Sequence, residues 1–69
     1  MTIPASPQSF VKHKLQDVLE GQILRLGGDR FAVIAKHRRH RLVHLDLETE
    51  DGGPATLIGI PGARVMVRE

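Results

Sequence analysis

The chain has 69 residues, a formal net charge of +2 and no cysteine, so it forms one small domain without disulfide bonds or thiolate metal sites. No segment reaches the ~18 consecutive apolar residues of a membrane-spanning helix, and the first residues lack the basic and apolar regions of a secretory signal. Both aromatic residues are phenylalanines, which argues against platforms that stack single-stranded bases and against grooves for proline-rich peptides. We therefore expect a cytoplasmic protein with no membrane partner.

The first third of the chain fits two alternative structures. Residues 1–9 contain two prolines and small polar residues, and we expect them to be a disordered leader that precedes a single domain at residues 10–69. Residues 10–20 fit a helix capped by Ser9, with the apolar side chains along one side. They also fit a strand from Phe10 to Leu15 that is followed by a turn, and periodicity alone does not decide between the two.

From residue 21 onward, short apolar runs alternate with turns that contain glycine or proline. The runs expected to be strands are residues 22–26, 30–35, 42–47, 56–58 and 64–68. Gly27-Gly28-Asp29 joins the first two runs, which predicts a β-hairpin. Short strands at this spacing predict an all-β fold that bends strongly or closes into a small barrel, because closure removes exposed strand edges.

Residues 15–33 resemble the opening of the SH3-like N-terminal domain of bacterial elongation factor P. In that family an aspartate, a glycine, a glycine turn and an aromatic residue precede a hydrophobic strand and a basic hairpin loop. The matching residues here are Asp17, Gly21, Gly28 and Phe31. The resemblance implies an SH3-like barrel of five or six short antiparallel strands with one short N-terminal helix or turn, and it favours strand plus turn for residues 10–20.

The same resemblance does not extend to the known role of that family. Its hairpin carries a modifiable lysine, whereas the tip here reads His37-Arg38-Arg39-His40, so we do not expect a modification-dependent function. The chain also resembles short orphan barrel proteins of actinobacteria and their phages, whose roles are mostly unassigned. The resemblance therefore implies a fold and not a function.

The strongest functional signal is a run of six consecutive residues that are cationic or can become so. They are Lys36, His37, Arg38, Arg39, His40 and Arg41. The run lies between two apolar strands, so we expect it at a hairpin tip, where arginines can bind the phosphates of a nucleic-acid backbone. Protonation of the histidines on acidification would strengthen such binding. The opposing interpretation is a solvated loop whose charges pair with Asp46, Glu48 and Glu50.

Metal binding and catalysis are weakly supported by the sequence. On a strand His40 and His44 would share a face and His37 would point elsewhere unless the loop folds back, so we expect no metal site. No serine, histidine and aspartate stand in an arrangement typical of a catalytic triad, and the glycine turn lacks the lysine of a phosphate-binding loop. We expect no enzymatic activity and no cofactor.

The last apolar runs are hydrophobic on both faces, which is more than a one-sided sheet needs. Barrel closure or a second subunit would bury them, and the candidate interface residues are Leu42, Ile58 and Met66. The sequence thus predicts a non-enzymatic binding module that contacts nucleic-acid backbone through residues 36–41. The alternative is a protein-interaction module, an adaptor or phage-type inhibitor, that docks on an acidic protein surface or forms a homodimer through a sheet edge.

Overall fold

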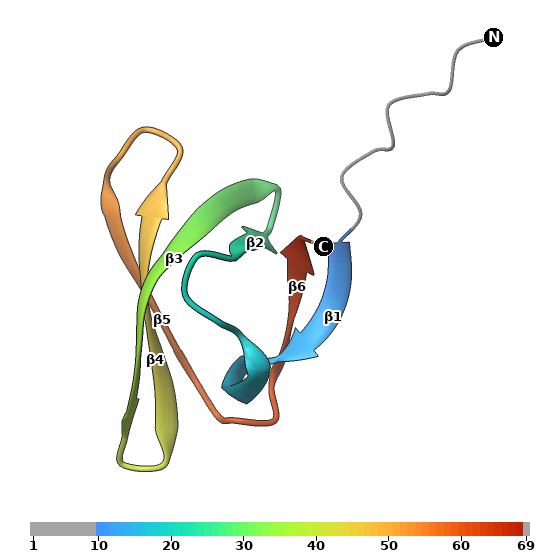
Figure 1. Cartoon of the computed structure of the whole chain (residues 1–69), viewed down its shortest axis with the longest axis vertical. Helices are drawn as coiled ribbons and strands as arrows, with labels where there is room; N and C mark the ends of the chain where they lie inside the picture. Colours follow the sequence, from blue (N-terminus) through green and yellow to red (C-terminus); the bar gives the residue numbers. More distant parts are fainter. Residues whose placement is uncertain (1–9, 69) are drawn as a thin grey trace, which may run out of the picture.

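The computed structural model describes residues 10–68 (Figure 1). In chain order its elements are strand β1 (Phe10–Lys14), the 3-10 helix η1 (Leu15–Asp17) and strands β2 (Ile23–Leu26), β3 (Asp29–Arg39), β4 (Leu42–Thr49), β5 (Pro54–Gly59) and β6 (Arg64–Arg68). The expected all-β class is confirmed, and so is the strand-plus-turn alternative for residues 10–20. The expected leader at residues 1–9 lies outside the described residues. Between residues 10 and 68 there is no helix long and apolar enough to cross a membrane.

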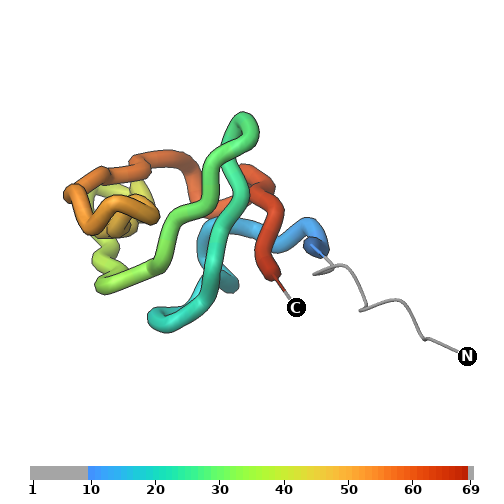
Figure 2. Tube along the Cα trace, turned by 90° about the horizontal axis from the view of Figure 1, so that it is seen from above, coloured from blue at the N-terminus to red at the C-terminus, as the bar shows by residue number. Residues whose placement is uncertain are grey.

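All six strands belong to one antiparallel sheet with the order β1-β6-β2-β3-β4-β5. Strand β3 joins the two halves of this sheet, because residues 29–32 pair with β2 and residues 31–39 pair with β4. The register between β3 and β4 shifts at residues 33–35, where a β-bulge bends the strand. The sheet therefore curls around its inner face and gives a small barrel-like shape (Figure 1; Figure 2).

The hydrophobic core lies on the inner face of the curled sheet. Its buried residues are Leu15, Val18, Leu24, Val33, Val43, Leu45, Leu47 and Val67. Buried and more exposed residues alternate along β4, as expected for a strand with one face on a core. Helix η1 contributes Leu15, whose backbone N–H donates to the Ala63 carbonyl at 2.8 Å. The core thus fixes which face of each strand points outward.

Candidate anion-binding site at the hairpin tip

Strands β3 and β4 form a hairpin whose turn contains only His40 and Arg41, because Arg39 pairs with Leu42. Both turn residues have a positive φ, 50° for His40 and 66° for Arg41. A two-residue turn between twisted antiparallel strands needs this left-handed conformation at both positions, and asparagine and glycine adopt it most readily. The hairpin tip therefore holds two large side chains where the backbone favours small ones.

The β2–β3 turn meets the same requirement with glycine. Leu26 pairs with Asp29, so this turn also has two residues, and its Gly27 and Gly28 have φ values of 65° and 141°. A left-handed conformation costs roughly 1–2 kcal/mol at a residue that carries a Cβ. Glycine therefore avoids backbone strain at the β2–β3 turn, whereas His40 and Arg41 are strained at the β3–β4 turn. Strain of this kind is often concentrated at functional sites.

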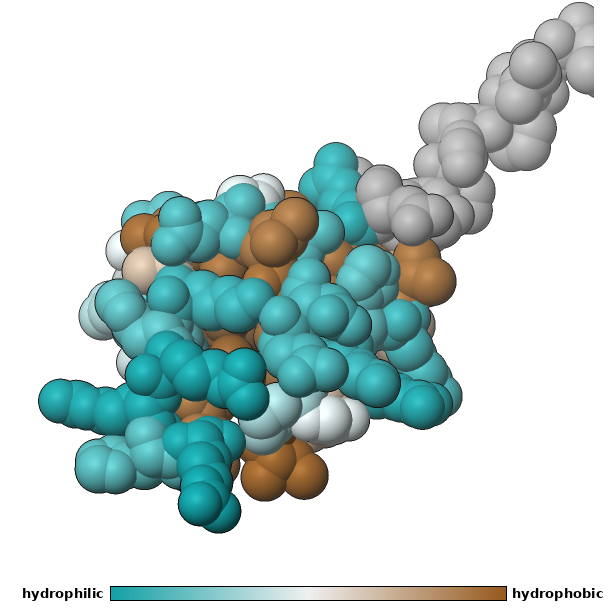
Figure 3. All heavy atoms as spheres, turned by 60° about the horizontal axis from the view of Figure 1, so that its bottom comes forward, coloured by the Kyte–Doolittle hydropathy of each residue, from teal (hydrophilic) through white to brown (hydrophobic). Residues whose placement is uncertain are grey.

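The three arginines at the tip point in different directions. Arg38 is opposite Val43, a core residue, so it extends the inner face of the hairpin, whereas Arg39 is on the outer face and Arg41 is at the turn. All three are exposed. Figure 3 shows strongly hydrophilic side chains projecting from this end of the molecule. Within residues 10–68 no carboxylate lies within ion-pair distance of any of them.

The first two residues of the basic run have partners within the domain. The Lys36 Nζ donates a hydrogen bond of 2.6 Å to the backbone carbonyl of Gln16, so this lysine ties the base of the hairpin to η1. The His37 Nε2 lies 3.1 Å from the Asp46 Oδ2 across the two strands, and both side chains are more than half exposed. The free positive charge at the tip therefore comes from the three arginines, with His40 beside them.

The reversal of the chain at the tip sets the arrangement of the histidines. His37 and His44 share the outer face because they lie directly opposite each other, whereas His40 is in the turn. A continuous strand would have placed His40 and His44 on one face, but the chain folds back after Arg39. No group of three histidines or carboxylates in the described part of the chain is placed to hold a metal ion.

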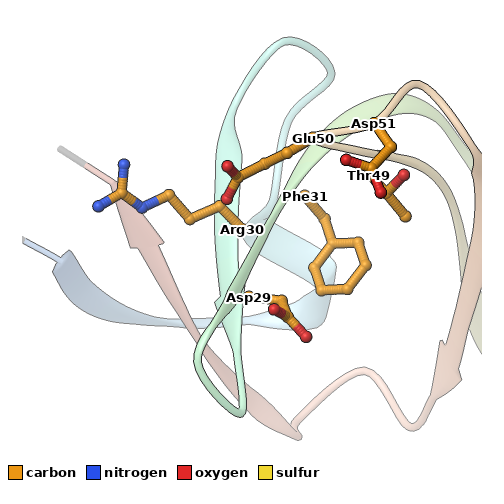
Figure 4. A pocket seen from close by; sticks show the side chains of 6 residues that line it. All are labelled: Asp29, Arg30, Phe31, Thr49, Glu50 and Asp51. Carbon is orange, nitrogen blue, oxygen red and sulfur yellow. The ribbon is translucent and has the colours of Figure 1, made fainter.

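Three of the four acidic residues of positions 46–51 lie at the opposite end of the hairpin. Glu48 is opposite Pro54, and Glu50 and Asp51 follow β4 in its turn to β5. Figure 4 shows Glu50, Asp51, Arg30 and Phe31 around an open pocket at this end. The eight residues of β4 span about 24 Å, so these carboxylates do not reach the tip. Of the three carboxylates expected to pair with the basic run, Asp46 alone among residues 10–68 lies within hydrogen-bond distance of it, at His37.

The three candidate interface residues do not form one patch. Leu42 and Ile58 lie on the outer face of β4 and β5, where Ile58 is 52% exposed and stands opposite His44. Met66 lies on the other half of the sheet, opposite Lys12 of β1 and Arg25 of β2, and is half-buried. Only the first two can contribute to a common surface near the tip.

Comparisons with known proteins identify no family for this chain. No protein-family model matches it, and a search of curated proteins finds no similar sequence. The function is therefore inferred from the site.

Proposed function

We propose that this chain is a non-enzymatic binding module whose hairpin tip holds the phosphates of a nucleic-acid backbone. The main support is the set of three exposed arginines that have no carboxylate partner within residues 10–68. Guanidinium groups stay charged at all physiological pH values and bind phosphate oxygens in a bidentate manner. The left-handed backbone at His40 and Arg41 adds to this support, because a purely solvated turn would gain stability from glycine or asparagine.

The directions of the arginines favour a ligand that contacts more than one side of the tip. Arg38 and Arg39 point to opposite faces of a two-stranded ribbon, and Arg41 extends its end. A ribbon of this kind fits the major groove of B-DNA, which is about 12 Å wide and is bordered by phosphates on both sides. The tip lacks aromatic side chains, so we expect contacts to the backbone with little base selectivity.

Salt-dependent binding tests this proposal. Fluorescence anisotropy would measure the affinity for a short DNA duplex over a series of salt concentrations. The variant Arg38→Ser/Arg39→Ser/Arg41→Ser should bind more weakly, and the slope of log K against log salt should become shallower by up to about 2.7, or about 0.9 per lost phosphate contact. Lysine at the same three positions is the matched control, because it keeps the charge and should keep most of the slope. An unchanged affinity and slope in the serine variant would refute the role of the tip.

A protein-interaction module is the second candidate. Ile58 is exposed beside Leu42 on the outer face, and β5 is at one end of the sheet. Within residues 10–68 the outer edge of β5 has no neighbouring strand, so its backbone groups are accessible to a strand of another molecule. Sedimentation equilibrium of the wild type and of Ile58→Lys would test self-association through this edge. A wild-type protein that stays monomeric at high concentration would rule it out.

A further inference from the structure

Six of the ten lysines and arginines lie together on the outer face of one half of the sheet, although they are scattered along the sequence. We call this surface the cationic face. Its charged residues are Lys12, Lys14, Arg25, Arg30, Arg64 and Arg68, from strands β1, β2, β3 and β6. All six are exposed. The strand register brings them together, because the residues that alternate with them in these strands face the inner side.

Two pairs of like charges stand directly opposite each other on the cationic face. Lys14 is opposite Arg64 on β1 and β6, and Arg25 is opposite Arg30 on β2 and β3. Like charges in this position destabilise an antiparallel sheet. Among residues 10–68 no carboxylate forms an ion pair with any of the six cations. Such an array is electrostatically unfavourable in the isolated domain and becomes favourable when a polyanion covers it.

The neighbours of the cationic face show where an anion has access. Its uncharged positions are Phe10, Ile23, Ala32 and Met66. Glu48 and Glu50 border it on the side of β4, where they line an open pocket with Arg30 and Arg68. The part formed by β1, β6 and β2 carries no acidic residue on this side, so the approach of an anion is most favourable there.

The dimensions of the cationic face suit a duplex. Residues two apart on a strand are separated by about 6.8 Å and neighbouring strands by about 4.8 Å. The cations therefore extend about 14 Å along β6, from Arg64 to Arg68, and about 14 Å across the four strands. This area is wide enough to reach phosphates on both sides of a groove that is about 12 Å wide.

The surface around these cations is less suited to a lipid bilayer. Within residues 10–68 the most exposed large hydrophobic residues are Leu19, Ile34, Ile58 and Ile60, and none of them lies on the cationic face. Phe10 is half-buried, and the guanidinium of Arg25 lies 5.8 Å from the centre of its ring. A surface with little apolar area to insert favours a polyanion over a membrane.

We infer that the cationic face is a second contact surface for the sugar-phosphate backbone of duplex nucleic acid. The inference rests on the proposed function in taking nucleic acid as the ligand, but it concerns different residues. Arg30 and Arg39 stand near the two ends of β3, about 30 Å apart. The cationic face and the hairpin tip therefore contact separate segments of a long duplex, and one molecule has two sites of contact.

The test compares two variants that each lose three cations. The face variant is Lys14→Ser/Arg25→Ser/Arg64→Ser, and the tip variant is the serine variant of the three tip arginines. With a duplex of about 40 base pairs, the face variant should bind about ten-fold or more weakly near 0.1 M salt, with a slope shallower by up to about 2.7. The charge-conserving control is Arg25→Lys/Arg64→Lys, which leaves Lys14 unchanged. Circular dichroism would verify folding, and we expect the face variant to be about as stable as wild type at low salt, because the loss of both like-charge pairs offsets the loss of the contact between Arg25 and Phe10.

The outcomes separate the two proposals. Weaker binding by the folded face variant supports the cationic face, whether or not the tip variant also binds weakly. If the face variant keeps the wild-type affinity and salt slope while the tip variant binds weakly, this inference is overturned and the proposed function stands. A wild-type protein that binds no duplex overturns both. The inference is also overturned if the wild-type protein binds vesicles of anionic lipid more strongly than DNA and the face variant loses this binding. That result would assign the surface to a membrane.

Discussion

The backbone of the hairpin tip gives a sharp prediction about Arg41. Its φ of 66° nearly equals the 65° of Gly27 at the other two-residue turn. Replacing a residue that carries a Cβ by glycine at such a position removes about 1 kcal/mol of backbone strain. We therefore expect Arg41→Gly to raise the free energy of unfolding by about 1 kcal/mol, which corresponds to a rise in Tm of about 4–8 °C in a domain of this size. Arg41→Ala keeps the Cβ and should leave the stability nearly unchanged.

Urea denaturation of the three proteins measures this difference, and the charge is controlled because glycine and alanine both remove the same guanidinium. Both variants should weaken duplex binding to a similar extent. Gly27→Ala is the reverse control: a Cβ there meets nothing within 4 Å, so its expected loss of about 1 kcal/mol comes from the backbone alone. Equal stability of Arg41→Gly and Arg41→Ala would refute the view that the left-handed backbone at residue 41 lowers the stability of the domain.

Three further substitutions test how the hairpin is supported and how its charge is balanced. Gly59→Ala should destabilise the fold by about 1–3 kcal/mol in urea denaturation, because a Cβ there would lie 2.6 Å from the buried Leu15 Cδ1. An unchanged stability would mean that η1 shifts without cost to make room for the Cβ. Lys36→Met removes the hydrogen bond to the Gln16 carbonyl and should cost about 1 kcal/mol, measured in the same way, whereas a stable variant would show that this bond does not hold the hairpin. Asp46→Asn should change stability by less than about 1 kcal/mol, since the contact with His37 is exposed. The same variant should tighten duplex binding in anisotropy by removing a negative charge near the tip, and weaker binding would contradict this.

The sequence was most informative where structure depends on near neighbours. The two glycines at residues 27–28 predicted the β2–β3 turn, because positive φ at both positions is a local requirement. Along β4 the apolar residues at every second position are the buried ones, since side chains of a strand alternate between its faces. The helix alternative for residues 10–20 could not be rejected by periodicity. It was decided by the pairing of β1 with β6, two segments at opposite ends of the described chain.

The candidate site depended more on register than on residue type. The run of cations predicted a basic tip, but the position of the turn at His40 and Arg41 decided its contacts. Three arginines have no carboxylate partner within residues 10–68, Lys36 reaches Gln16, and His37 contacts Asp46. No local pattern marks this turn, since it contains neither glycine nor asparagine. Its position follows from the pairing of all of β3 with β4.

The sequence by itself thus determined the class of fold and one cluster of charge, because alternation, turn residues and consecutive cations are properties of neighbouring positions. Only the tertiary structure decided where the remaining cations stand. Lys14 and Arg64 are fifty positions apart and become opposite each other through the pairing of β1 with β6. Curling of the sheet turns one side of each strand toward the core, so the cations that alternate with inward-facing residues share the outer face. A surface built in this way follows from strand order and register, which short-range sequence patterns do not specify.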